Sequence, residues 1–244
     1  MKLGISIDRD EAVQITISVL AISLAMALYF AGLDGLLASP LEFLVFVPAV
    51  LVTVGSGFIL HEMAHKLVAL EYGAQARFRM WNGGLVFMFV AIVVLGVFFA
   101  APGAVYIYAP RITNRQNGLI SIAGPMLNFT LAVFFVALEF IAPVKQFFTF
   151  LAPAGMAYAG YGISNGMLHV WHFGAAMNLV LGLFNMIPAF VLDGAKVLRW
   201  NKFAWIGFVI LLMGLGILVT GPGIIIGWAI MAALLWVLSK FFFR

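Results

Sequence analysis

The sequence contains no cysteine. A disulfide framework is therefore excluded, and so is a metal site built from thiolates. Any metal that this protein binds must be held by histidine, aspartate or glutamate side chains. The chain has only four histidines and nine acidic residues from which such a site can be built.

Charged residues are also scarce. They make up 9% of the 244 residues, and hydrophobic residues make up 65%, whereas a soluble globular chain has about 25% charged residues. Together with a mean hydropathy of +1.14, this composition predicts a polytopic protein embedded in the lipid bilayer. The net charge of +4 does not indicate nucleic-acid binding, because the thirteen basic residues are spread thinly along the chain.

One apolar run, at 43–69, contains the sequence His61-Glu62-Met63-Ala64-His65. Positions i and i+4 of an α-helix share a face, so both histidines can bind the same Zn²⁺ while Glu62 reaches a water beside it as general base. Ionisable residues at membrane depth are costly, which favours a functional role for them. The pattern predicts one zinc ion per chain, with His61 and His65 as ligands and Glu62 as a catalytic residue.

We expect an all-α polytopic fold with six transmembrane helices, because six apolar runs approach the length needed to cross a ~30 Å hydrocarbon core. The expected spans lie at about 12–32, 41–70, 119–142, 175–195, 203–219 and 223–239. Residues 76–108, between the second and third spans, are predicted as a re-entrant region with a β-hairpin, since 77–79 and 104–108 are typical of strands beside turns. These parts form one domain over residues 1–244.

The basic residues indicate how this region lies in the membrane, because cytoplasmic loops carry an excess of Lys and Arg. If 85–101 enters the membrane and returns, twelve of the thirteen basic residues lie on the cytoplasmic side with the N-terminus, and only Lys145 lies outside. If 85–101 crosses as a seventh helix, the basic cluster at 196–202 faces outward. The rule favours a re-entrant segment packed near the site, because non-helical backbone at that depth is tolerated only against protein or water.

A catalytic zinc site usually has three protein ligands, so one more must come from elsewhere in the chain. The candidates for this third ligand are Glu71, Glu139, His169, His172 and Asp193. At 1.5 Å per residue, His61 lies ~30 Å below the outer end of its span and Asp193 ~27 Å below the outer end of its own. This match near the cytoplasmic side favours Asp193, and the alternative is an interfacial acid that caps a helix end beside Lys196.

Three motifs resemble those of the site-2 protease family: HExxH at 61–65, GPxxN at 124–128 and NxxPxxxLDG at 185–194, in that order. The resemblance implies an intramembrane zinc metalloprotease that cuts the transmembrane helices of membrane-anchored substrates. It also implies individual roles, namely His61, His65 and Asp193 as zinc ligands, Glu62 as catalytic acid and base, and Asn185 and Asn128 as substrate contacts.

The same residues can be checked against the demands of peptide hydrolysis. Asn185 can donate a hydrogen bond to the developing oxyanion, although an interhelical hydrogen bond would also explain an Asn in a span. Asn185 and Pro188 interrupt the fourth span, and Pro188 is expected to kink it and so help to orient Asp193. The edge of the predicted hairpin can accept an unwound substrate strand by β-augmentation.

Two other functions fit part of the pattern. The first is a different membrane zincin with Glu139 as its third ligand, which a comparison of zinc content in Asp193→Ala and Glu139→Ala would separate. The second is a membrane metal transporter or sensor that uses the His/Asp cluster as a transit site. A transporter should keep metal flux in Glu62→Gln, whereas a protease should lose cleavage and retain zinc.

Overall fold

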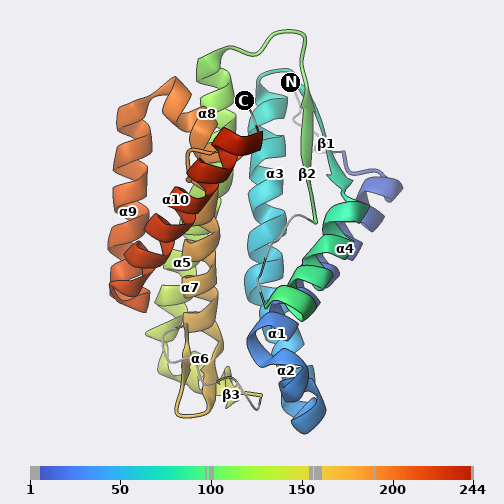
Figure 1. Cartoon of the computed structure of the whole chain (residues 1–244), viewed down its shortest axis with the longest axis vertical. Coiled ribbons are helices and arrows are strands. Elements are labelled where there is room, and N and C mark those ends of the chain that lie inside the picture. The colour runs from blue at the N-terminus through green and yellow to red at the C-terminus, as the bar shows by residue number, and fades with distance from the viewer. Residues whose placement is uncertain are drawn as a thin grey trace.

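The first helix of the chain is long and kinked. The computed structural model describes residues 6–96, 98, 102–153, 156, 161–189 and 191–242, and Figure 1 shows how the elements are arranged. Helix α1 (Arg9–Ala38) begins where the Asp8 carboxylate accepts a hydrogen bond from the N–H of Glu11, an N-cap that satisfies an otherwise unpaired donor. Gly32 has φ +68°, a value that glycine adopts without strain, and the predicted span 12–32 ends at this kink.

An unbroken helical rod follows. It consists of α2 (Pro40–Val50), a π-helical segment (Leu51–Gly55) and α3 (Ser56–Glu71), and its 32 residues are long and apolar enough to cross a membrane. The predicted span 41–70 coincides with this rod. In the π-helical segment the N–H of Ser56 donates to the carbonyl of Leu51, five residues earlier, whereas an α-helix uses the carbonyl four residues earlier.

A two-stranded antiparallel sheet comes next. Strand β1 (Gln75–Met80) pairs with β2 (Gly103–Tyr108), and Met80 lies opposite Gly103. Between the strands the chain forms α4 (Asn82–Val90) and a π-helical turn (Ala91–Leu95), while positions 97 and 99–101 of the predicted segment 85–101 lie outside the described residues. The strands predicted at 77–79 and 104–108 are present, and the chain leaves and rejoins the sheet at one paired position. Its re-entry into the membrane stays a prediction.

Helix α1 is fastened to this sheet and to α3 by buried polar contacts. The Glu11 carboxylate accepts from the Lys66 ammonium at 2.6 Å and from the N–H of Phe78 at 2.9 Å. The side-chain oxygen of Gln14 accepts from the N–H of Met80 at 2.9 Å. Glu11 and Lys66 are both buried, and a buried charge persists only where a partner compensates its desolvation. These contacts cover the edge of β1 that faces away from β2.

The middle of the chain combines a long helix with a second, smaller sheet. Helix α5 (Asn114–Glu139) begins with a capping box between Thr113 and Gln116. It overlaps most of the predicted span 119–142 but begins five residues earlier and ends three residues earlier. It leads to α6 (Ala142–Phe147) and to a three-stranded antiparallel sheet with the order β3–β5–β4, formed by β3 (Thr149–Leu151), β4 (Ile163–Ser164) and β5 (Met167–His169). This sheet was not predicted.

The fourth span, predicted at 175–195 with an interruption at Asn185 and Pro188, is divided there into two helices. Helix α7 (Val170–Asn185) begins earlier and ends at Asn185, and a turn separates it from α8 (Asp193–Trp200). The apolar run continues through the turn, so hydropathy does not mark the break. The predicted kink of a helix at Pro188 is wrong, because this proline lies in the turn. Helices α9 (Lys202–Thr220) and α10 (Gly223–Phe242) agree with the last two predicted spans.

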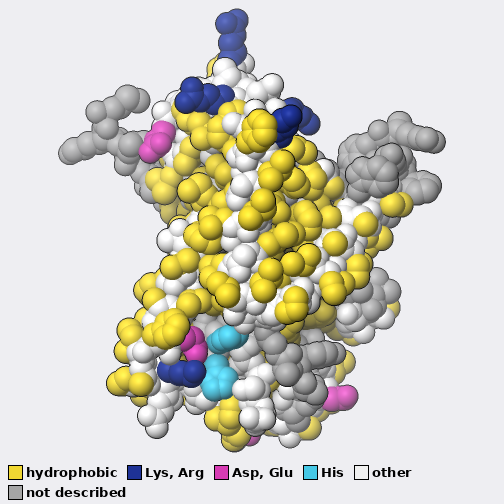
Figure 2. Space-filling model, turned by 90° about the vertical axis from the view of Figure 1, so that its left-hand side faces the viewer, with side chains coloured by type: hydrophobic (Ala, Val, Ile, Leu, Met, Phe, Trp, Pro, Cys, Tyr) yellow, Lys and Arg dark blue, Asp and Glu magenta, His cyan; other side chains and the backbone are white. Residues whose placement is uncertain are grey.

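Within the described residues, four helical runs are long and apolar enough to cross a membrane: Arg9–Ala38, Pro40–Glu71, Asn114–Glu139 and Lys202–Thr220. Six spans stay a prediction, since α7 has 16 residues. Figure 2 shows hydrophobic side chains across the middle of one face and Lys and Arg side chains at its upper end. Apolar residues of α9 such as Ile210 and Leu218 are 64% and 83% exposed, as expected of a surface that lipid covers.

Helix α5 occupies the centre of the bundle. It packs against α3, α7 and α8, and Figure 1 shows α3 and the β1–β2 sheet to one side of it and α9 to the other. Phe46 and Phe173 pack edge to face between α2 and α7 in the largest apolar cluster. This arrangement brings the motifs on α3, α5 and α8 together, although they are far apart in the sequence.

Candidate metal centre

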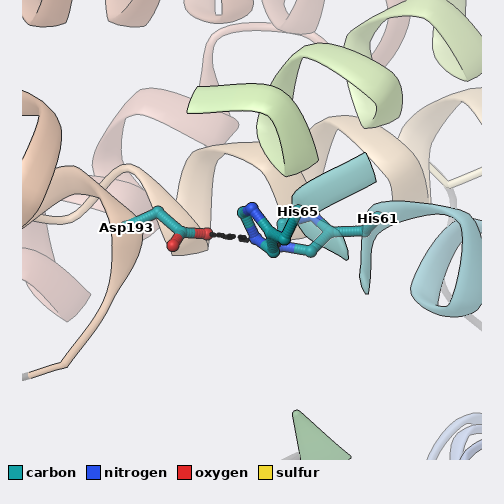
Figure 3. A group of neighbouring side chains, drawn as sticks. All are labelled: His61, His65 and Asp193. Carbon is teal, nitrogen blue, oxygen red and sulfur yellow. Dashed lines mark hydrogen bonds and ion pairs between the residues drawn. The ribbon is translucent and has the colours of Figure 1, made fainter. Parts of the chain in front are cut away.

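The side chains of His61, His65 and Asp193 converge on one point (Figure 3). The Nε2 atoms of the two imidazoles lie 3.1 Å apart. One carboxylate oxygen of Asp193, Oδ2, lies 3.3 Å from Nε2 of His61 and 3.1 Å from Nε2 of His65. All three residues are buried. The histidines are adjacent because they are one helical turn apart on α3, and Asp193 reaches them from the first residue of α8.

The other ring nitrogens are held by acceptors on α5. Nδ1 of His61 lies 2.6 Å from the side-chain oxygen of Asn128, and Nδ1 of His65 lies 2.7 Å from the carbonyl oxygen of Ile120. Since a carbonyl oxygen only accepts, each Nδ1 donates a proton to its acceptor on α5. This leaves each Nε2 as the nitrogen that can offer a lone pair to a metal ion, next to the carboxylate oxygen of Asp193.

This donor set fits Zn²⁺. With metal–ligand bonds of ~2.0–2.1 Å, two ligands at neighbouring corners of a tetrahedron lie about 3.3 Å apart, close to the 3.1–3.3 Å separations in this cluster. Ring N–H groups bound to oxygen acceptors are also typical of metal-binding histidines. Among the described residues this is the only group of three histidine, aspartate or glutamate side chains near enough together to hold an ion.

The other predicted candidates for the third ligand have different partners or positions. Glu139 accepts from the backbone N–H of His172 and pairs with Lys145, and Nε2 of His172 lies 2.9 Å from the carbonyl oxygen of Val219. His169 belongs to the β3–β5–β4 sheet, where burial lowers its pKa. Glu71 ends α3 with an exposed side chain. None of these four residues belongs to the cluster.

Gly124 makes room for both imidazoles. A Cβ atom at this position of α5 would lie 2.5 Å from Nε2 of His61 and 2.6 Å from Nε2 of His65, which is well inside van der Waals contact. The absence of a side chain therefore lets the backbone of α5 approach the two ligands. This is the physical reason for a glycine at the start of the GPxxN motif.

A relay of two asparagines supports His61 from behind. Nδ2 of Asn128 donates to the carbonyl of Gly57 and to Oδ1 of Asn178. Nδ2 of Asn178 in turn donates to the carbonyl of Thr53, in the π-helical segment, and to that of Gly174. These side chains are buried, and their polar groups therefore need hydrogen-bond partners within the protein. Asn128 bonds to His61, Gly57 and Asn178 and also lines the cavity beside the cluster, and its role as a substrate contact stays a prediction.

Asn178 supports the site although no motif in the sequence points to it. It lies on α7, fifty residues after Asn128, and is completely buried. An asparagine in an apolar helix commonly makes interhelical hydrogen bonds. That signal was available, but it does not indicate which helix holds the partner.

Glu62 lies beside the cluster and faces the two-stranded sheet. Its Oε2 atom accepts a hydrogen bond of 2.7 Å from the backbone N–H of Val105 in β2. Both residues line a cavity of about 700 Å³. Candidate ligands, other polar side chains and apolar side chains line the cavity, among them His61, Asn117, Lys196, Met26, Phe58 and Leu181.

Asn185 also lines this cavity. Its Nδ2 atom donates to the carbonyl of Leu181, one turn earlier on α7, and its second N–H remains for another acceptor. The turn after Asn185 is packed tightly, since a Cβ at Gly194 would lie 2.2 Å from the carbonyl oxygen of Met186. The indole N–H of Trp205, on α9, donates to the same carbonyl at 2.8 Å. These contacts fix the position of α8 and of Asp193.

The fold and the site define a helical membrane protein with a buried centre of two histidines and one aspartate that fits a metal ion. The model of Peptidase family M50 matches residues 49–205, which is more than half of the chain and includes all three motifs. The chain belongs to this family, which confirms its resemblance to site-2 proteases.

Individual relatives agree with the family assignment. A candidate zinc metalloprotease of Methanocaldococcus jannaschii, MJ0611, is 39% identical over 198 residues, which cover 80% of this chain and 86% of the relative. A candidate zinc metalloprotease of Bacillus subtilis, YwhC, is 28% identical over 68% of this chain and 74% of its own length. Zinc metalloprotease MJ0392 of Methanocaldococcus jannaschii is 27% identical over 58% of this chain and 30% of its own length.

A second family model matches the N-terminal part of the chain. A model of the SecE/Sec61-gamma subunits of the protein translocation complex matches residues 6–45. This match covers α1 and the beginning of α2, a small part of the chain. No solved structure gave a significant match.

Proposed function

We propose that this chain is an intramembrane zinc metalloprotease that hydrolyses peptide bonds within or near transmembrane helices of membrane-anchored substrates. The observation that carries the proposal is the cluster of His61, His65 and Asp193 with Glu62 beside it, inside a bundle of apolar helices. Family M50 and the zinc metalloproteases among the relatives support the same activity.

Zinc would be held by Nε2 of His61, Nε2 of His65 and Oδ2 of Asp193. Bound there, it would supply the Lewis acidity that activates water and polarises a carbonyl group. The protein contributes the fixed orientation of the ligands, through Asn128 and Ile120 behind the rings. Such supporting hydrogen bonds set both the orientation and the basicity of the imidazoles.

Glu62 is the general acid and base of this proposal. It follows His61 directly and lines the same cavity as the three ligands. From this position its carboxylate takes a proton from the attacking water and later gives it to the departing amine. Asn185 lines the same cavity, and its second N–H donates to the oxygen of the scissile carbonyl as negative charge develops there.

Water reaches the site from the end of the molecule that carries most basic residues. Asn117, Ser121 and Lys196 are among the polar residues that line the cavity, and Lys196 also pairs with Asp193 at 3.5 Å. Since cytoplasmic loops carry the Lys and Arg excess, the N-terminus and the active site face the cytoplasm. A short polar passage then suffices for hydrolysis inside the bilayer.

The substrate binds as an added strand on β2. The outer edge of β1 is occupied by Glu11 and Gln14 of α1, so only the edge of β2 is available. This edge lines the cavity through Gly103, Val105 and Ile107. A scissile peptide bond in a helix is protected by its own hydrogen bonds, and an extended segment paired with β2 would expose it beside Glu62.

The test combines zinc content with cleavage of a model transmembrane substrate. Glu62→Gln should keep its zinc, because Glu62 is not among the three ligands, and should lose cleavage by roughly 10²–10⁴-fold. Glu71→Gln, an exposed glutamate on the same helix, is the matched control and should retain both. Full cleavage by Glu62→Gln would refute the assigned role. Zinc transport across vesicles without cleavage by the wild type would establish the transporter instead.

A further inference from the structure

The hydrogen-bonding groups of β2 point in two directions. In an antiparallel pair, residues alternate between positions that bond to the partner strand and positions that point away from it. The N–H groups of Phe78 and Met80 point away from β2, since they donate to Glu11 and Gln14. Val105 lies opposite Phe78, and Gly103 lies opposite Met80. The backbone groups of Val105 and Gly103 therefore point to the free edge of the sheet.

One of these edge groups is already in use. The N–H of Val105 donates to Oε2 of Glu62 at 2.7 Å, which is the length of a charge-assisted hydrogen bond. Among the described residues it is the only hydrogen-bond donor to this carboxylate. Oε2 therefore occupies the place at which a carbonyl oxygen of an added strand would accept. Glu62 and a substrate strand compete for the same N–H.

We infer that the N–H of Val105 is a substrate-binding group that Glu62 holds in the free enzyme and hands over when a substrate strand pairs with β2. This inference rests on the proposed function and describes how the substrate first binds to the proposed protease. Before substrate binds, the general base is tied to the sheet. When a strand arrives, its carbonyl takes the N–H and the Glu62 carboxylate is free to turn toward the water at the metal site. Docking of substrate and release of the base are then one event.

A simpler role for Val105 makes a different prediction. If its N–H only orients Glu62 and stays bound throughout, removing the Glu62 side chain should not change how tightly substrate binds. If the N–H is handed over, removing its competitor should tighten binding. The difference lies in substrate affinity, so it can be measured in variants that do not cleave.

The experiment measures binding of a fluorescent transmembrane peptide that the zinc-loaded wild type cleaves in nanodiscs. Glu62→Gln keeps an oxygen that accepts from Val105, whereas Glu62→Ala removes the acceptor. Each is prepared alone and with Val105→Pro, which removes the N–H. A proline fits this position because the N–H does not bond to β1. Val105→Ala, which keeps the N–H, is the control for the lost side chain, and zinc content checks that every variant is folded at the site.

Handover predicts that Glu62→Ala binds the peptide about 2- to 10-fold more tightly than Glu62→Gln, the range expected for one net hydrogen bond. With Val105→Pro the two variants should bind equally and more weakly. Equal affinity of Glu62→Ala and Glu62→Gln in the presence of Val105 overturns the inference, and this comparison does not depend on the proline variants. A difference that persists with Val105→Pro overturns it as well.

Cleavage by the wild type separates this inference from the proposed function. If the zinc-loaded wild type cleaves the peptide while the Glu62 variants bind it equally, only the handover is refuted. If the wild type cleaves no transmembrane peptide, the proposed function and the handover are refuted together.

Discussion

Gly124→Ala should disable the metal centre. The added Cβ would lie 2.5 Å from Nε2 of His61, 2.6 Å from Nε2 of His65 and 2.7 Å from Cδ2 of His61. Ordinary contact between such atoms begins at 3.4 Å, so the rings would have to retreat by about 1 Å. They cannot do so freely, because Asn128 and Ile120 behind them are buried.

The size of the effect follows from this displacement. Metal–ligand distances tolerate deviations of about 0.2 Å, several times less than the required shift. Loss of a supporting hydrogen bond alone weakens metal binding by roughly 10–100-fold, and displacement of both imidazoles should cost at least about 100-fold. Alanine is ordinarily favoured over glycine inside a helix by roughly 1 kcal/mol, but Pro125 follows directly, and a Cβ on the residue before a proline disfavours helical geometry.

The assay is competition for zinc with a fluorescent chelator, together with thermal unfolding of the metal-free protein. Gly207→Ala is the matched control, since Gly207 lies inside α9 with nothing within 4 Å of the added Cβ. Gly124→Ala should lose zinc affinity and cleavage relative to the control, and its unfolding temperature shows how far the displaced rings also destabilise the fold. Zinc affinity equal to the wild type would refute the placement of both rings against α5.

Three further variants test separate parts of the site. Asp193→Asn should lower zinc affinity by at least about 100-fold because a charged ligand is removed. Glu139→Gln should leave zinc affinity unchanged. Equal losses of zinc affinity in chelator competition would contradict Asp193 as the third ligand. Asn128→Ala should weaken zinc binding about 10–100-fold, and an unchanged zinc titration would show that the ring does not need this acceptor. Trp205→Phe should lower the free energy of unfolding by about 1 kcal/mol through the lost hydrogen bond to Met186, and denaturation in urea checks this value.

Patterns within short segments of the sequence predicted the two histidine ligands and the two strands beside them. The spacing of His61 and His65 defines a shared face as soon as the segment is helical, and strands 77–79 and 104–108 were visible from their turns and composition. Asp193 was chosen because its depth in the membrane, counted in residues from the outer end of its span, matches that of His61. An error of a few residues in a helix boundary changes this depth only slightly. Asp193 is indeed beside the histidines, although the helix expected to carry it ends at Asn185.

The remaining features depend on contacts between distant segments. The break between α7 and α8 lies in an apolar run, where hydropathy is the same for a helix and for a tightly packed turn. The residue before a proline disfavours helical geometry, but that rule places the end only near Pro188 and not at Asn185. The supporting role of Asn178 follows from the packing of α7 against α3 and α5, which no local pattern encodes.

The π-helical segment Leu51–Gly55 sets the rotational phase of the helix that carries the histidines. A π-turn accommodates one residue more than an α-helical turn, and one residue corresponds to a rotation of about 100° around the helix axis. Deleting a residue here and restoring a regular helix would turn His61, Glu62 and His65 by that angle relative to α2. The number of residues in this segment, about two helical turns before His61, therefore sets the direction in which the catalytic side chains point.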